Sequence, residues 1–178
     1  MLKSTLRGMA CCAALASAPL GAASLPVRGE LTFTAHGPAG LKIEGQSSAV
    51  SSAVDPTTIT FTLELSSLKT GIDVRDRHMR EDLQVQTYPT AELRVPRTGL
   101  QSPAPGGEVK STCHGALTLH GQTHDVTISY DAKRTGGYDV AGSFQIDLRD
   151  YGIAPPKYLG VAVKPDVQIA AELHLDAL

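Results

Sequence analysis

The residues of this sequence best suited to hold a metal are three histidines, His114, His120 and His124, which lie close together in the chain. Neutral imidazole is a common zinc ligand, and an expected turn between two strands could bring the three side chains together. A solvated hairpin end accounts for the same residues without any ligand. We therefore predict no metal site and no cofactor.

The acidic and nucleophilic residues form no pattern typical of an enzyme. Four acids cluster in segment 73–82, but the sequence has no His-Glu-x-x-His, no Gly-x-Ser-x-Gly, no glycine-rich phosphate loop and no paired-cysteine metal motif. Cys113 has no Cys-x-x-Cys partner and is expected to be a small buried residue, with a reactive thiol as the alternative. These features predict a binding protein, and a metal-dependent enzyme is the lesser alternative.

Two arginines are candidates for binding an anionic head group. Arg75 and Arg149 each carry a guanidinium, which presents a two-pronged fork to a phosphate or carboxylate. Each arginine is followed by an aspartate, Asp76 or Asp150. An ion pair that fixes the fold is therefore the alternative for both motifs.

Alternation of apolar and polar residues recurs along the chain and predicts the strands that must position these side chains. In segment 58–65 the residues Ile59, Phe61 and Leu63 share one face, and segment 125–132 follows the same rule. Similar alternation occurs at 31–33, 41–43, 91–95, 117–119, 144–148 and 167–175. Turn residues separate these segments, so we expect about eight antiparallel strands.

One segment breaks the strand rhythm and predicts a short helix. Ile72, Met79 and Leu83 have the spacing of one helical face between residues 72 and 83. Asp73 is expected to cap this helix, and Asp76 precedes Arg80 at the four-residue spacing that favours an ion pair.

A sheet of about eight antiparallel strands must protect its edges, and closure into a barrel removes them. We therefore predict an all-β barrel with one short helix and no division into further domains. A barrel of this size is either filled by its side chains or has room for one small ligand, and a packed two-sheet sandwich is the alternative.

Several blocks of this sequence resemble the YceI-like family of bacterial periplasmic proteins, also described as lipid- or polyisoprenoid-binding. The blocks are Leu-Ser-Ser-Leu-Lys-Thr-Gly at 65–71 with Arg-Asp-x-His-Met-Arg at 75–80, Tyr-Pro-Thr at 88–90, Gly-Ala-Leu-Thr-Leu-His-Gly at 115–121 and Arg-Asp-Tyr-Gly-Ile at 149–153. The last block has one residue fewer between Arg and Asp than the family pattern. The resemblance implies a lipocalin-like barrel whose hydrophobic tunnel holds a polyisoprenoid or similar lipid.

Burial of a long apolar tail would supply the affinity for such a ligand, because each buried methylene contributes about 0.8 kcal/mol. Residues on the inward face of the strands are therefore the candidates for contact with it. On the alternation pattern they are Phe33, Ile43, Ile59, Phe61, Leu63, Leu93, Leu117, Leu119, Val126, Ile128, Phe144, Ile146 and Ile169.

The first residues are typical of a signal peptide. Lys3 and Arg7 precede an uncharged run that ends in small residues, so cleavage is expected near Ala23, with residues 1–23 as the signal peptide and 24–178 as the mature barrel domain. The run is too short to span a bilayer, so we expect a periplasmic protein without a transmembrane segment.

The mature chain would have fourteen basic residues against eighteen acidic ones, a poor composition for binding nucleic acid. The oligomeric state is left open, a homodimer included. An alternative to a lipid carrier is a stress-response or protein-interaction module without a bound lipid.

Overall fold

The computed structural model describes residues 25–158 and 161–176, which form an antiparallel β-barrel with one α-helix. The main sheet has ten strands in the order β1-β4-β5-β6-β7-β8-β9-β12-β2-β3, and β10 and β11 form a separate two-stranded ribbon. The bounds are β1 Leu25–Pro26, β2 Arg28–His36, β3 Lys42–Ser47, β4 Val50–Val54, β5 Thr58–Glu64, α1 Asp73–Asp82, β6 Thr90–Pro96, β7 Glu108–Leu119, β8 Gln122–Arg134, β9 Tyr138–Asp147, β10 Lys157–Tyr158, β11 Val161–Ala162 and β12 Asp166–Leu175.

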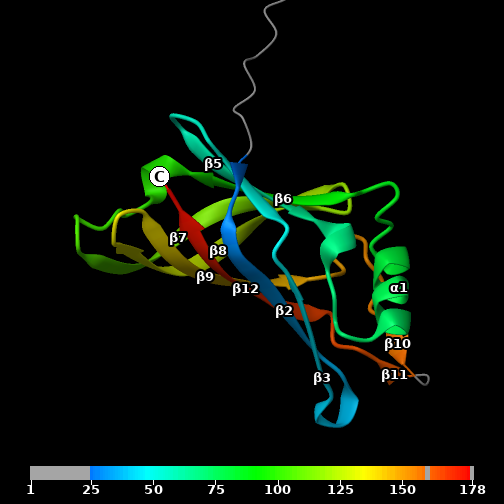
Figure 1. The fold of residues 1–178 in the computed structure, drawn as a ribbon. Helices are drawn as coiled ribbons and strands as arrows, with labels where there is room; N and C mark the ends of the chain where they lie inside the picture. Colours follow the sequence, from blue (N-terminus) through cyan, green and yellow to red (C-terminus); the bar gives the residue numbers. More distant parts are fainter. Residues whose placement is uncertain (1–24, 159–160, 177–178) are drawn as a thin grey trace, which may run out of the picture.

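The first strands nearly close this sheet into a ring (Figure 1). β1 pairs with β4, whereas β2 pairs with β12 and β3, and only Val27 separates β1 from β2. The Val27 N–H donates to the Val50 carbonyl at 3.0 Å, and Gln46 of β3 forms a bridge with Lys69. The barrel predicted from the sequence is therefore confirmed, and the alternative of a packed two-sheet sandwich is not.

The barrel has more strands than the eight expected, because β1 and β4 carry weak patterns. β1 is only two residues long. In β4 the buried positions are Val50 and Ser52, so a serine occupies an inward position where alternation would place an apolar residue. β7 and β8 extend to 12 and 13 residues, well beyond their apolar cores.

Helix α1 lies against one end of the barrel, beside β10 and β11 (Figure 1). Its range agrees with the predicted helix, but its capping differs from the prediction. The N-cap residue is Ile72, which has no side-chain capping bond, and Asp73 is already inside the first turn. Across the residues the structure describes, no ion pair within 4.0 Å joins Asp76 to Arg80, because Asp76 binds Thr70 and Arg80 reaches the Ser66 carbonyl at 3.5 Å.

Three single turns of 3-10 helix complete the fold: η1 Pro38–Gly40 in the β2–β3 hairpin, η2 Leu65–Ser67 before α1 and η3 Arg97–Gly99 after β6. Within residues 25–158 and 161–176, no helix has the length and apolar character needed to cross a lipid bilayer.

Candidate ligand-binding cavity

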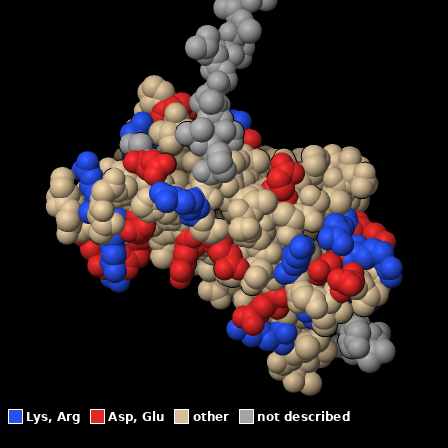
Figure 2. Space-filling model, in the orientation of Figure 1, with Lys and Arg blue, Asp and Glu red and all other residues tan. Residues whose placement is uncertain are grey.

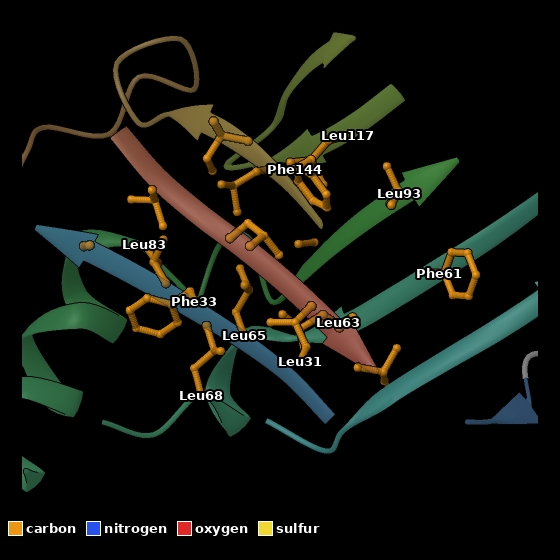
Figure 3. A pocket seen from close by; sticks show the side chains of 18 of the residues that line it. Leu31, Phe33, Phe61, Leu63, Leu65, Leu68, Leu83, Leu93, Leu117 and Phe144 are labelled. Carbon is orange, nitrogen blue, oxygen red and sulfur yellow. The ribbon is translucent and has the colours of Figure 1, made fainter. Parts of the chain in front are cut away.

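The interior of the barrel contains a cavity of about 1270 Å³ (Figure 3). The strand register places inward residues of neighbouring strands side by side, because alternate residues of a strand share one face. Phe61 pairs with Leu93, and Leu93 pairs with Leu117, so these three form one row of the wall. Phe144 pairs with Ile169, which in turn pairs with Phe33, and these three form another. The wall is apolar along both rows.

Small residues leave the space that the larger ones surround. Ala171 of β12 pairs with Gly142 of β9, and both line the cavity. A Cβ atom added at Gly142 would have only one neighbour within 4 Å outside its own chain neighbours, the Cγ2 atom of Ile128 at 3.9 Å. The lumen beside Gly142 is therefore open, and a larger side chain there would project into it.

Most of the residues predicted to face inward do line the cavity. Val126 is the exception: it is buried in the apolar core with Tyr151 and Ile153, but it does not reach the cavity surface. Alternation fixes the face on which a residue lies, but it does not show whether neighbours cover it. The lining residues that were predicted are Phe33, Ile43, Ile59, Phe61, Leu63, Leu93, Leu117, Leu119, Ile128, Phe144, Ile146 and Ile169.

A second part of the lining comes from segments outside the ten-stranded sheet, which the sequence analysis did not assign to the cavity. The spacing of Ile72, Met79 and Leu83 predicted an apolar helical face, and this signal could have located one end of the cavity. Leu65 continued the alternation of segment 58–65, whereas Leu68 gave no comparable signal, because it follows a single 3-10 turn. This part of the lining includes Leu65, Leu68, Thr70, Ile72, Val74, His78, Met79, Glu81, Asp82, Leu83, Ala154, Pro155, Pro156 and Lys157.

Thr70 joins Arg75 and Asp76 at the α1 end of the cavity. Arg75 donates from Nε to the Thr70 hydroxyl at 2.8 Å and from Nη2 to the Thr70 carbonyl at 2.9 Å. The Asp76 carboxylate accepts the Thr70 amide at 2.8 Å and the Thr70 hydroxyl. Thr70 and Arg75 line the cavity, so this network fixes a guanidinium at its surface.

The Asp76 carboxylate is held ionised in this network although it is 5% exposed. Burial raises its pKa, but the hydrogen bonds from Thr70 and the charges of Arg80 and Arg75 outweigh burial and hold the pKa below its ordinary value. No ion pair within 4.0 Å joins Asp76 to Arg75 in the described chain. The expected ion pair is thus replaced by a shared hydroxyl group.

Comparison with known proteins identifies the family of this chain. A sequence profile of the YceI-like domain matches residues 23–175. The chain belongs to the YceI-like family. Among solved structures it is similar to a polyisoprenoid binding domain from Saccharophagus degradans, with 19% identity and a TM-score of 0.71 over 87% of this chain and 98% of that one. BcnA of Burkholderia cenocepacia is also 19% identical, with a TM-score of 0.65 over 82% and 95% of the two chains.

These likenesses confirm the lipocalin-like barrel that the YceI-like motifs predicted. Comparison with curated protein sequences gives no significant match. The predicted signal peptide lies almost wholly before the matched region and outside the residues that the structure describes.

Arg149 in the last YceI-like block has a different setting from Arg75. Its Nε atom donates to Asp147 Oδ1 at 2.9 Å and Oδ2 at 3.1 Å, and Nη2 also contacts Asp147. The expected pair with Asp150 is therefore wrong: the partner is two residues earlier, and the Arg149 side chain is 65% exposed. Arg149 does not line the cavity.

Of the three histidines of the YceI-like chain, His120 and His124 both contact Tyr151, whereas His114 lies beside Thr127. His114 Nδ1 lies 3.3 Å from the Thr127 hydroxyl, His120 Nδ1 lies 3.0 Å from the Tyr151 carbonyl, and the His124 ring meets the Tyr151 ring edge-on. In the part of the chain that the structure describes, no three His, Cys, Asp or Glu side chains are arranged to hold a metal ion. Tyr151 is fully buried beside them, and burial, with the nearby Asp150 charge, raises its pKa to about 12.

Cys113 is buried on β7 and lines the cavity. Burial raises the pKa of its thiol, which favours the unreactive protonated form. The prediction of a small buried residue is confirmed.

Proposed function

We propose that this YceI-like protein binds an apolar amphiphile, a polyisoprenoid or another lipid, in the lumen of its barrel and carries it without catalysing a reaction. The observation that carries the proposal is the apolar cavity of about 1270 Å³. Small-molecule sites typically measure about 300 to 1,000 Å³. A cavity larger than this range suits a long tail better than a small polar metabolite.

The distribution of polar groups supports one orientation of the ligand. The charged lining residues, Arg75, His78 (when protonated), Glu81, Asp82 and Lys157, belong to α1 or to the β10 segment at the same end of the barrel. A tail in the strand-lined interior would gain about 0.8 kcal/mol for each buried methylene. A polar head would avoid desolvation if it stayed at the α1 end.

Arg75 is our candidate for contact with an anionic head. Two of its nitrogens, Nε and Nη2, bind Thr70, which leaves Nη1 for a ligand. For Arg149 we propose a structural role through Asp147, because its side chain is outside the cavity. Asp76 supports Arg75 through Thr70, and we assign no ligand contact to Asp76 or Asp150.

We also propose that residues 1–23 are removed as a signal peptide and that the protein acts in the periplasm. The support is the charged head and uncharged run of the N-terminal sequence. A lipid carrier in the periplasm would shield the apolar tail of its ligand from water.

The decisive experiment is extraction of the purified protein with organic solvent, followed by mass spectrometry, together with native mass spectrometry of the intact protein. We expect a lipid-sized adduct on the wild type. Gly142→Leu should lose most of it, because the new side chain projects into open lumen. Ala141→Leu is the matched control, since Ala141 is the exposed neighbour on β9. A wild type without any adduct that also fails to bind an added polyprenol would contradict the proposal, as would equal ligand content in both variants.

A further inference from the structure

The cavity runs along the barrel from the α1 end to a loop at the opposite end. On β12, both Val167 near the start of the strand and Leu175 at its end line the cavity. The stretch from Val167 to Leu175 measures about 26 Å along the strand, at about 3.3 Å per residue, and about 20 Å along the barrel axis at a strand tilt of about 40°. The β6–β7 loop, residues 97–107, lies at the end of the barrel opposite α1 (Figure 1).

The β6–β7 loop reaches over the lumen through a contact with Tyr130. Leu100, Gln101 and Ser102 of this loop line the cavity, as does Tyr130 of β8. The Tyr130 hydroxyl accepts the Gln101 N–H at 2.8 Å and donates to the Gln101 carbonyl at 3.2 Å. Tyr130 points inward, so backbone that bonds to the tip of its side chain must itself lie over the lumen.

Both ends of the β6–β7 loop are also fixed to the barrel. The Arg97 N–H donates to the Thr57 carbonyl at 2.8 Å, in the turn between β4 and β5. At the other end, the Gly106 N–H donates to the Arg134 carbonyl at 2.9 Å, and the Arg134 N–H donates to the Gly107 carbonyl at 3.1 Å. The loop therefore bridges β5 and β8, which β6 and β7 separate in the sheet. Displacing it would break these bonds, so it forms a fixed wall.

The outer surface at this end is charged. Glu108, where β7 begins after the loop, lies 3.4 Å from the Lys110 ammonium and 3.4 Å from that of Lys133. Figure 2 shows both basic and acidic side chains at this end of the molecule. A tail that passed the loop would leave an apolar lumen for a hydrated surface and lose the free energy of burial.

We propose that residues 100–102 are the floor of the cavity and set the longest apolar tail that the barrel accepts. Tyr130 satisfies both backbone groups of Gln101, so the end of a tail can rest against the Leu100 side chain without burying an unpaired polar group there. The inference rests on the proposed function, because it requires a tail in the lumen with its head at the α1 end. Each added carbon strengthens binding until the tail reaches the floor, and affinity then stops rising.

The test is the affinity of the purified protein for linear prenyl alcohols of increasing length: geraniol, farnesol, geranylgeraniol and solanesol. Displacement of parinaric acid, a fluorescent probe, measures each affinity. For the wild type we expect affinity to rise along the series up to a break and no further. Leu100→Ala should deepen the floor and raise affinity beyond the break about fourfold or more relative to the shorter alcohols, the gain from one more buried methylene.

Leu148→Ala is the matched control, because Leu148 is also a half-buried leucine that lines the cavity, but it follows β9 at the α1 end. It should lower affinity for all the alcohols by a similar factor and leave the break in place. Tyr130→Phe keeps the ring and removes the hydroxyl. We expect it to move the break toward longer alcohols and to speed hydrogen exchange of the Gln101 amide about fivefold, the value of one net hydrogen bond.

Three results would overturn the floor: wild-type affinity that rises along the whole series without a break, the same change of length profile in Leu100→Ala and Leu148→Ala, or a break that neither Leu100→Ala nor Tyr130→Phe moves. In each of these cases the protein still binds prenyl alcohols, so the carrier function stands and only the floor fails. A wild type that binds none of the alcohols and holds no lipid would overturn both.

Discussion

The middle of the cavity and its α1 end are built from different elements and different side chains. Strands form the middle, and their register places neutral residues such as Phe61, Leu93 and Leu117 in continuous rows. The α1 end is formed by a helix and irregular segments, and its lining includes Arg75 and Asp82. Strand pairing fixes apolar side chains over a long surface, whereas a helix terminus can present charges at one point. The comparison teaches that, under the proposed function, a tail and a head group would be bound by separate parts of this barrel.

The variant with the largest expected effect places a charge in the apolar middle of the cavity. Phe61→Asp would leave a carboxylate in the lumen without a partner, so we expect a loss of about 3 to 5 kcal/mol in unfolding free energy and loss of bound ligand. Thr60→Asp on the outer face of β5 is the control, since Thr60 does not line the cavity. Urea denaturation and lipid extraction measure the two effects. Unchanged stability and ligand content would contradict the inward position of Phe61.

A smaller effect is expected from neutralising the buried carboxylate at the α1 end. Asp76→Asn should lower the unfolding free energy by about 1.5 kcal/mol, because the bonds from Thr70 lose their charge-assisted part. Asp147→Asn should cost less, since Asp147 pairs with a largely exposed arginine. Equal losses in the two variants would show that the Thr70 network does not hold this end of the barrel.

The same carboxylate gives a prediction for pH. The pKa of Asp76 is lower in the folded protein than in the unfolded chain, so its contribution is complete above the unfolded value of about 3.9 and is lost as the pH falls through the folded value. The difference in unfolding free energy between wild type and Asp76→Asn should therefore shrink as the pH falls below about 4. Denaturation at several pH values measures this, and a constant difference would be inconsistent with an ionised Asp76.

The smallest expected effect concerns the two arginines. Arg75→Gln should weaken binding of farnesyl phosphate about fivefold, the value of one modest hydrogen bond, and should leave binding of farnesol unchanged. Arg149→Gln should affect neither ligand, because Arg149 binds Asp147 outside the cavity. Fluorescence competition with both ligands provides the measurement. If Arg149→Gln were the variant that discriminated between them, the head group would bind elsewhere.

Strong local patterns allowed much of the fold to be predicted. Alternation in segment 58–65 placed Ile59, Phe61 and Leu63 on the cavity side because a strand has a period of two. The same rule missed β4, where Ser52 occupies an inward position, and it placed Val126 at a surface that its neighbours cover. Alternation shows on which face of a strand a residue lies, but it does not show how deeply the side chain is buried.

Side-chain partners were less predictable than faces. Adjacency in the sequence suggested that Arg75 pairs with Asp76 and Arg149 with Asp150. In the structure, Arg75 and Asp76 are joined through Thr70, and Arg149 binds Asp147. Sequence neighbours often point in different directions, so the choice of partner depends on rotamers and on residues brought close by the fold. The exposed lining residues Leu41 and Ile72 escaped prediction for the same reason, since they are distant in the chain.

The sequence by itself determined the class of this protein: its periodicity specified antiparallel strands, and its motifs specified the YceI-like family. Only the tertiary structure decided that the nearly closed sheet encloses open space beside Gly142, which charged residues line the cavity, and which apolar lining residues remain exposed. The physical reason is that strand periodicity is a local property of the chain. Volume, depth and contact arise from the simultaneous packing of residues that are far apart in sequence.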